Sequence, residues 1–345
     1  MPRQSAQKYS PYQTAKPLPT FIVRRAFAAV TIGAVLTMAM PALAQSDYPN
    51  RPVHLIVPYG PGGVADVNMR IVAERLSDRL KQQFVVENRP GAGGIVAAKA
   101  VASAAPDGYT MLMTGNNTTI ATALFESLPF NVLTDFASTS TTGFYDLLIL
   151  TKAGASMKSF QDFIDKARAN PGKINIAATA PGSTQNLAAE LLRSMAGINA
   201  TIVTFRTSAD MMTALLRGDV DVAFEFFGAA SGMISSDKVI PLASTGSRRS
   251  AYLPDVPTVQ ESGVKDYEAV TWTGISVPVR TPPAVIEVLT KAINEVLPAR
   301  EVQERGKTLG MDLRGSTPEE MTARLKSDIT KWSAVIEKAG IQKMK

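Results

Sequence analysis

The chain has 345 residues, no cysteine and a single histidine, with 36 basic against 30 acidic residues. The absence of thiols excludes disulfides, a cysteine nucleophile and thiolate metal sites, and a single imidazole cannot form a zinc cluster with other histidines. His54, inside VHLIVPY, is interpreted as a strand residue rather than a catalytic base. We therefore expect no thiol nucleophile, no histidine triad and no metal site, and no cofactor is expected.

Residues 1–44 have the pattern of a secretion signal. They carry five basic residues and no acid, then the apolar run AFAAVTIGAVLTMAM (26–40) and the small-residue site Ala42-Leu43-Ala44. This order is typical of a cleaved signal peptide, and the run is shorter than the roughly 20 residues of a membrane span. Arg24-Arg25 leaves a twin-arginine route open beside Sec export. We expect a periplasmic protein that begins at Gln45.

Removing this leader changes the charge balance of the protein. The remainder has 31 basic and 30 acidic residues. A nearly neutral chain lacks the basic footprint of a nucleic-acid-binding protein, so no nucleic acid partner is expected.

Strand-like and helix-like stretches alternate along the rest of the chain, which predicts α/β architecture. The expected strands cover 53–57, 84–86, 109–113, 147–150, 174–178, 202–205 and 220–224. The expected helices cover 67–80, 95–103, 159–169, 187–195 and 209–216, with one starting near 282 and a last one ending near 339. About 300 residues exceed the size at which a single core stops growing, so two lobes are expected.

Two glycine turns share one pattern, with Pro61-Gly62 in VPYGPGGVAD (57–66) and Pro181-Gly182 in ATAPGSTQNLAAE (178–190). Each turn follows a strand and precedes a helix, whose first N–H groups and positive partial charge can hold anionic oxygens. Two such turns facing across a cleft would hold one small anion, although each could also be only a tight turn. A nucleotide is not expected, because the third glycine of a dinucleotide fingerprint and the G-K-[ST] of a phosphate-binding loop are both missing.

Several longer stretches carry a family resemblance: YPNRPVHLIVPYGPGGVAD, VVENRPGAGG, DGYTMLM, KARANPGKINIA, GDVDVAFE, RRSAYLPDVPTVQESG and WTGISVPVRTPP. With them, residues 48–345 resemble the periplasmic substrate-binding proteins of tripartite tricarboxylate transporters, the Bug family. The resemblance implies a two-lobed Venus-flytrap fold of type II-like α/β class, a ligand cleft between the lobes and no enzymatic activity. It also implies a monomer that delivers a small carboxylate to the membrane subunits of a tripartite tricarboxylate transporter.

The expected lobe boundaries follow from the same resemblance. Lobe 1 comprises 45–147 plus 271–345, and lobe 2 comprises 148–270. The chain is expected to cross between the lobes near 144–150 and 268–275, and the lobes should hinge about these crossings when ligand binds.

The resemblance also places the ligand. The expected ligand-binding residues are Tyr59, Gly60, Pro61, Gly62, Gly63, Val64, Ala65, Asp66, Thr114, Asn116, Asn117, Thr118, Ala180, Gly182, Ser183, Thr184, Gln185, Phe205, Arg206 and Glu225. Trp272 is expected close to the crossover. The chain departs from the family at Phe205-Arg206-Thr207 (for Tyr-Lys/Arg-Gly), at Asn186 (for His) and at Glu225 (for Asp), so the identity of the ligand does not follow from the family.

Two of these positions, Asp66 and Arg206, have alternative interpretations. Asp66 either caps a helix at Val67 or, with Glu225, meets a ligand that carries a hydrogen-bond donor. Arg206 either pairs with a ligand carboxylate or forms a salt bridge with Glu225. Arg248-Arg249 is interpreted as a solvated surface feature.

Two other functions use the same architecture. A secreted α/β enzyme is disfavoured by the single histidine and by the absence of G-x-S-x-G. A ligand-binding subunit of a signalling system would share the fold and differ only in its partners.

Overall fold

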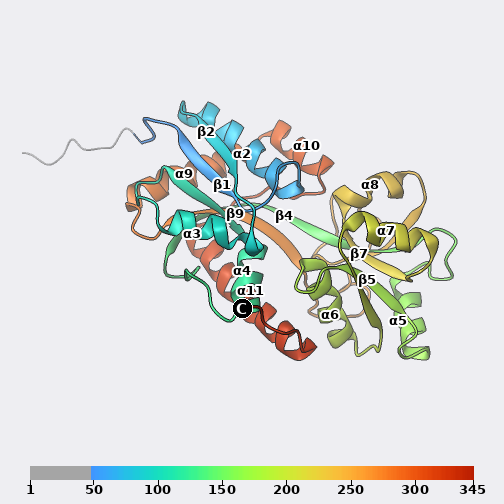
Figure 1. Cartoon of the computed structure of the whole chain (residues 1–345). Helices are drawn as coiled ribbons and strands as arrows, with labels where there is room; N and C mark the ends of the chain where they lie inside the picture. The colour runs from blue at the N-terminus through green and yellow to red at the C-terminus, as the bar shows by residue number, and fades with distance from the viewer. Residues whose placement is uncertain (1–47) are drawn as a thin grey trace, which may run out of the picture. The chain divides into compact units, whose positions relative to one another are not determined.

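The computed structural model describes residues 48–345, apart from the side chain of Ala92, so the expected signal sequence lies outside the described residues. Strands and helices alternate through this part of the chain (Figure 1). The strands are β1 (Val53–Val57), β2 (Phe84–Asn88), β3 (Thr110–Gly115), β4 (Phe136–Lys152), β5 (Asn175–Thr179), β6 (Thr201–Phe205), β7 (Val222–Phe226), β8 (Val239–Ser244) and β9 (Val270–Pro278). The α/β prediction is confirmed.

The helices lie mostly between successive strands. They are α2 (Val64–Leu80), α3 (Ile95–Ala102), α4 (Asn116–Leu124), α5 (Phe160–Ala169), α6 (Thr184–Ala196), α7 (Ser208–Arg217), α8 (Phe227–Ser235), α9 (Pro283–Val296), α10 (Arg300–Thr308) and α11 (Pro318–Ala339), with a short 3₁₀ turn η1 (Ala92–Gly94). None of the helices within 48–345 is long and apolar enough to cross a membrane.

Two sheets share the long strand β4. The first has the order β2-β1-β3-β9-β4, and the second places β8 on one side of β4 and β7-β5-β6 on the other. Strand β4 pairs with β9 as far as Asp146 and with β7 from Leu147 onward. We call the elements around the first sheet lobe 1 and those around the second sheet lobe 2; Figure 1 shows β4 running from one to the other.

The return crossing begins where β9 starts at Val270, inside the expected range 268–275. The partner switch at Asp146 and Leu147 likewise falls inside 144–150. We predicted that two bodies move separately, one comprising 45–147 plus 271–345 and the other 148–270. This division stays a prediction.

Apolar clusters fill the space between sheets and helices. In lobe 1, Leu55, Met69 and Leu76 are fully buried between the first sheet and α2. One lobe 2 cluster also takes in Leu124 of α4 and Trp332 of α11. The end of α11 therefore packs against lobe 2, where α11 also contacts α6. This helix forms a third connection between the lobes.

Three helices (α4, α8 and α10) and two strands (β8 and β9) were not among the elements expected from the sequence. No helix was expected directly after the strand at 109–113, but α4 starts at Asn116 in the sequence NNTTIATAL. Asparagine and threonine are weak helix formers. Burial of Ile120, Ala123 and Leu124 stabilises the helix instead. Two others begin earlier than expected, since α2 starts at Val64 rather than Val67 and α6 at Thr184 rather than Leu187.

Candidate functional site

The turn between β1 and α2 is closed by a hydrogen bond to Asp66. Gly62 has φ +88°, which glycine adopts without strain. Its main-chain N–H donates to Oδ2 of Asp66 over 2.8 Å. Gly63, with φ −73°, is the N-cap of α2 and has no side chain to satisfy the first helical N–H groups. The first turn of α2 therefore keeps its main-chain donors available.

The turn between β5 and α6 repeats this geometry 120 residues later. Gly182 has φ +79°, and its N–H donates to Oδ1 of Asn186 over 3.0 Å. Here the N-cap is Ser183, whose Oγ accepts from the N–H of Asn186 over 3.1 Å. The N–H of Ser183 donates to the carbonyl of Ala180 over 3.0 Å. Ser183 thus uses its main-chain N–H and its hydroxyl inside the turn, and its contact with a ligand stays a prediction.

Asp66 is buried and braces the first turn. Besides Gly62, its carboxylate accepts from Nε of Arg70 (3.0 Å) and from Nδ2 of Asn88 (2.7 Å). Burial raises the pKa of Asp66, but the hydrogen bonds from Arg70, Asn88 and Gly62 outweigh it and hold that pKa below its usual value. Asp66 does not cap a helix at Val67, because α2 already starts at Val64. Direct contact between Asp66 and a ligand stays a prediction.

Asn88, in the stretch VENRPGAGG, connects that stretch to the glycine turn in VPYGPGGVAD. Its Nδ2 donates to Asp66 and, over 3.0 Å, to the carbonyl of Tyr59, while its Oδ1 accepts from Nη2 of Arg70 over 2.8 Å. The end of β2 therefore holds the turn that follows β1. We did not place Asn88 at the site from the sequence, although its motif was the available signal.

Side-chain contacts connect the starts of four helices in a ring. Pro58, before α2, lies beside Gly94, which lies beside Asn117 of α4. Nδ2 of Asn116 donates to Oγ1 of Thr184 in α6 over 3.0 Å.

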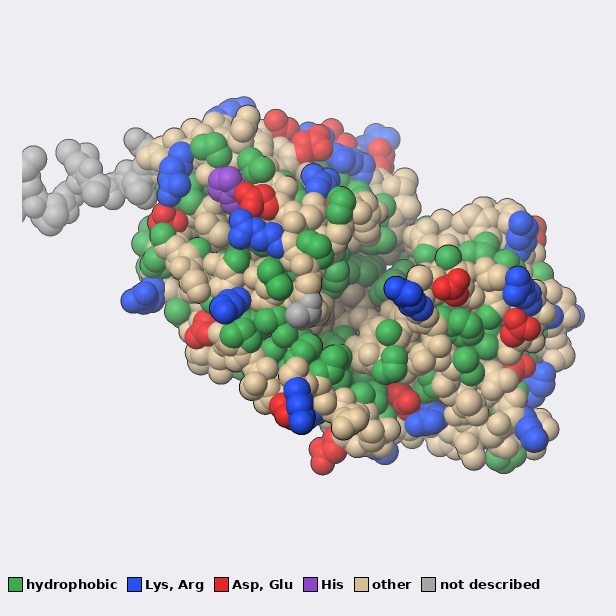
Figure 2. Space-filling view, viewed as in Figure 1, with side chains coloured by type: hydrophobic (Ala, Val, Ile, Leu, Met, Phe, Trp, Pro, Cys, Tyr) green, Lys and Arg blue, Asp and Glu red, His purple; other side chains and the backbone are tan. Residues whose placement is uncertain are grey.

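The ring continues through lobe 2 and closes on lobe 1. Gln185 of α6 lies near enough to the carboxyl of Glu225, at the end of β7, to lower its pKa. Glu225 precedes α8, and a Cβ on its residue Gly228 would lie 3.4 Å from Val64 of α2. Figure 2 shows that the molecular surface is hollowed between the two lobes on this face.

Helix starts in this ring carry main-chain N–H groups without an acceptor among residues 48–345. They belong to Gly63, Val64, Ala65, Asn117, Thr118, Thr184, Gln185, Gly228 and Ala229. Unpaired N–H groups and the positive ends of helix dipoles favour anions, and carboxylates are among the anions they bind. The ring is therefore suited to hold negatively charged oxygens.

Three predicted residues of α4 lie at the ring, and one of them has its side chain already engaged. Oδ1 of Asn116 accepts from the indole of Trp332 over 2.9 Å, so this residue links α4 to both α6 and α11. Thr118 is nearly buried, and Oδ1 of Asn117 is buried without a partner among the described residues.

Two other predicted positions are embedded in lobe 1. Thr114 is fully buried in β3, and its hydroxyl pairs with that of Ser276 over 2.9 Å, so its side chain is part of the sheet interior. Trp272 is also fully buried, and its indole donates to Asp328 over 2.7 Å. Trp272 pairs with Phe144 of β4, so it lies close to the crossover as expected. The side chain of Thr114 is part of the sheet interior, and its contact with a ligand stays a prediction.

Arg206 directly follows β6, and its side chain is exposed. Arg206 has no ion pair within the described part of the chain, so the alternative salt bridge to Glu225 is not formed. Phe205 before it is half-buried and packs on the core of lobe 2. Arg206 therefore remains available to a ligand carboxylate.

Glu225 is 1% exposed at the end of β7. Its Oε1 accepts from the N–H of Phe226 over 2.7 Å, whereas its Oε2 is buried with no hydrogen-bond partner within residues 48–345. Burial raises the pKa of Glu225, and Ser208, Phe226 and Gln185 lower it by less. Ionisation of Glu225 is therefore costlier than that of an exposed glutamate.

Tyr145 was not predicted at the site. It lies on β4 beside the crossing, and its ring packs against that of Phe226 with 5.3 Å between centroids. Burial and the nearby phenol of Tyr59 both raise its pKa. In the sequence Tyr145 lies in GFYDLLIL, a largely apolar stretch that predicts a buried strand and gives no sign of a ligand site.

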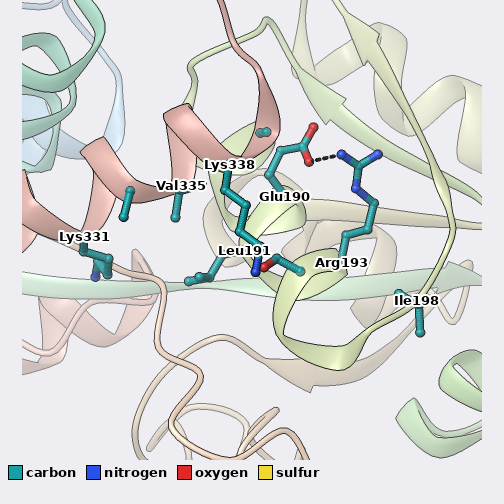
Figure 3. A pocket seen from close by; sticks show the side chains of 10 residues that line it. Glu190, Leu191, Arg193, Ile198, Lys331, Val335 and Lys338 are labelled. Carbon is teal, nitrogen blue, oxygen red and sulfur yellow. Dashed lines mark ion pairs between the residues drawn. The ribbon is translucent and has the colours of Figure 1, made fainter.

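A different hollow lies between α6 and α11. It has a volume of about 420 Å³ and is lined by Leu191, Val335 and Lys338, with the ion pair between Arg193 and Glu190 (2.6 Å) at its edge (Figure 3). These α6 residues lie in the second half of the helix, away from the glycine turn at its start. This groove is therefore separate from the ring.

The chain matches known proteins over most of its length. The model of the tripartite tricarboxylate transporter family receptor matches residues 68–341. Protein BugT of Bordetella pertussis is 33% identical over 89% of this chain and 95% of its own.

Two solved structures of relatives are described as complexes with small carboxylates. The structure of Rpa4515 of R. palustris with adipate has a TM-score of 0.74 at 29% identity, covering 86% of this chain and all of that one. MatC from Rhodopseudomonas palustris with bound malate has a TM-score of 0.68 at 28% identity, covering 84% and 100%.

The periplasmic binding protein BugD is also similar, with a TM-score of 0.70 and 30% identity over 86% of this chain and 100% of its own. These matches, together with two lobes joined through β4, establish the Venus-flytrap fold. They also establish a substrate-binding rather than an enzymatic role. The chain belongs to the tripartite tricarboxylate transporter family of receptors, the periplasmic solute-binding proteins of the TctC and Bug type.

Proposed function

We propose that this chain binds a small carboxylate between its lobes, at the ring formed by the starts of α2, α4, α6 and α8. The observation that carries the proposal is the set of main-chain donors in this ring, which have no acceptor among the described residues. Arg206, exposed and unpaired within the described part of the chain, supplies a second positive group for the far end of a dicarboxylate. The adipate and malate complexes of relatives support this class of ligand.

A thermal-shift screen of mono- and dicarboxylates tests the proposal. A ligand present at a hundredfold excess over its Kd stabilises the folded chain by about 2.7 kcal/mol, which is readily measured. We expect stabilisation by at least one small carboxylate and none by uncharged amides of the same size. No response to any carboxylate, in a folded preparation, would contradict the proposed ligand class.

Glu225 favours ligands that carry a hydroxyl or amino donor, because its Oε2 has no partner among the described residues. Succinate and malate form a matched pair that differs by one hydroxyl. Calorimetric titration should give tighter binding of malate, and Glu225→Gln should reduce that preference. Equal affinities for the two acids in the parent chain would remove Glu225 from the specificity of the site.

The delivery step is proposed from the family. We infer that the chain hands its ligand to the membrane subunits of a tripartite tricarboxylate transporter. Uptake of labelled ligand by cells that carry those subunits should require this chain. Unchanged uptake after its deletion, together with loss of a transcriptional response to the ligand, would instead favour the signalling alternative.

Export and assembly complete the proposal. Cleavage after Ala44 should give a periplasmic chain that starts at Gln45, as checked by intact mass. A mass that retains residues 1–44 would contradict the proposed processing.

Sedimentation should show a monomer. Small-angle scattering should show a smaller radius of gyration when a confirmed ligand saturates the protein.

A further inference from the structure

A cluster of charged residues surrounds the point where β4 crosses between the lobes. Asp146 is the last β4 residue paired with β9, opposite Val270, and Leu147 is the first paired with β7. A cavity of about 370 Å³ lies beside this point and is lined by both lobes, with Asp146 among its walls. Any rotation of one lobe against the other must change the surroundings of Asp146.

The fold holds the carboxylate of Asp146 without giving it a hydrogen bond. It lies directly against Gly246, where a Cβ would collide with both carboxylate oxygens. No described residue donates a hydrogen bond to either of these oxygens. A charge in this position is costly, because neither water nor a paired donor solvates it fully.

An ion pair spans the lobes next to Asp146. Arg248, in the segment after β8 of lobe 2, donates to Oδ2 of Asp312, in the segment between α10 and α11 of lobe 1. Nε of Arg314 lies 3.0 Å from the same oxygen. Asp312 is fixed to the crossing strand, since its main chain exchanges two hydrogen bonds with Phe144 over 2.8 and 2.9 Å. Separation of the lobes at this edge would break the pair between Arg248 and Asp312.

The charged and titratable groups around Asp146 come from every neighbouring segment. They are Glu268, which Arg324 of α11 holds at 3.0 Å, Asp312 and Arg314 after α10, Lys307 of α10, Arg248 and Arg249 after β8, and the phenols of Tyr145 and Tyr252. Burial, followed by the charges of Glu268 and Asp312, raises the pKa of Asp146 to about 7, and Arg248 and Arg314 oppose this increase. The proton on Asp146 is therefore exchanged near neutral pH.

We propose that Asp146 acts as a proton-controlled latch, in which its protonation keeps Arg248 of lobe 2 paired with Asp312 of lobe 1 and its ionisation weakens that contact. Neutral Asp146 tolerates the adjacent carboxylate of Asp312. Ionised Asp146 repels Asp312 and competes with it for Arg248. This latch follows from the two-lobed fold and is independent of which ligand the ring holds.

The direction of the pH effect follows from proton linkage. Opening the latch hydrates Asp146 and returns its pKa toward the ordinary aspartate value of about 3.9. The latched state thus binds more protons than the open state between about pH 4 and 7. Its stability is complete below this range, decreases as pH rises through it, and is constant above about pH 7. One proton per opening corresponds to a change of about tenfold per pH unit in the opening equilibrium.

Distance measurements between the lobes test the latch without a ligand. The chain has no cysteine, so spin labels attach only at Gln83→Cys in lobe 1 and Lys173→Cys in lobe 2, both exposed. Pulsed electron resonance from pH 5 to 8 should show the longer-distance population growing up to about tenfold per unit as pH rises to 7. In Asp146→Asn, which resembles the protonated acid, the distribution should not change with pH.

Two further variants separate the latch from general charge effects. Asp312→Asn removes the acid partner of Arg248 and should shift the distribution to longer distances at every pH. Glu126→Gln changes an exposed carboxylate that has no ion pair among the described residues, and it should keep the pH response of the parent chain. Circular dichroism at each pH verifies folding. The proposal would be overturned if the interlobe distance distribution of the parent chain did not change with pH, or if Asp146→Asn showed the same pH response as the parent.

Discussion

Asp66 and Asn186 occupy equivalent positions in the two glycine turns, and each accepts the main-chain N–H of the glycine four residues before it. They differ in what else they contact. Asp66 is ionised and held by Arg70 and Asn88, whereas Asn186 is neutral and needs no counterion. The same turn geometry is thus stabilised once by a charged network and once by an amide. The consequences can be measured separately in each lobe.

Asp66→Asn should destabilise the chain by about 1–3 kcal/mol at pH 7, because one amide cannot accept from Gly62, Arg70 and Asn88 together. The pKa of Asp66 is lowered in the folded chain, so its stabilisation is present above the unfolded pKa and is lost as pH falls through the folded pKa. The difference between variant and parent should therefore shrink in acid. Urea unfolding at several pH values measures this. Asp165→Asn, at an exposed position, is the control, and equal curves for Asp66→Asn and the parent would exclude the bracing role.

Gly63→Val should leave folding intact and abolish carboxylate binding. Gly63 has φ −73°, and a Cβ there meets nothing within 4 Å. A branched side chain would nevertheless cover the first N–H groups of α2. Calorimetric titration with the carboxylate identified by thermal shift checks the result, with Ala153→Val, an exposed position after β4, as control. If folded Gly63→Val binds the carboxylate with unchanged affinity, this loop is only a turn and does not bind the ligand.

Gly182→Ala should behave in the opposite way and damage the fold. Its φ of +79° is unfavourable for any side chain, and the added Cβ would lie 2.5 Å from Cδ2 of Leu124. Positive φ and overpacking each cost about 1–3 kcal/mol. Thermal unfolding should show a lower Tm than for Gly197→Ala, which has φ +62° but open space around it. Equal losses in the two variants would mean that the contact with Leu124 does not matter.

Arg206→Gln should weaken the binding of a dicarboxylate by about 10- to 100-fold, since a hydrogen bond to a charged group contributes about 1.5–3 kcal/mol. Unfolding should be unaffected, because the exposed Arg206 forms no ion pair with any residue in 48–345. Arg217→Gln, in the exposed last turn of α7, is the matched control for loss of a positive charge. Titration of both variants with the same dicarboxylate decides the role, and equal affinities would remove Arg206 from the site.

Glu225→Gln should make the chain more stable than the parent at neutral pH. Burial raises the folded pKa of Glu225, so the parent is most stable below the unfolded pKa of about 4.3 and loses stability as pH rises through the folded value. The neutral amide avoids this loss, and the two chains should converge in acid. Urea unfolding between pH 4 and 8 provides the measurement. A parent whose stability rises over this range relative to the variant would contradict the raised pKa.

The sequence alone determined the alternation of strands and helices, the two glycine turns and the family. Each depends on local information. Apolar periodicity marks an element, and Pro61-Gly62 or Pro181-Gly182 marks a turn before a helix. Helix starts were less certain, and α4, α8, α10, β8 and β9 were not predicted. In α4, tertiary burial of Leu124 and Ile120 outweighs the weak propensity of Asn116 and Thr118.

Only the tertiary structure decided what individual polar side chains do. Asp66 braces the first glycine turn through Asn88, 22 residues away, which donates to its carboxylate. Arg248 reads as surface in the sequence, yet it meets Asp312, 64 residues away, beside the crossing of β4. Such partners depend on how β4 passes from one sheet to the other. Local sequence carries no record of that path, because the contacts form only after distant segments pack together.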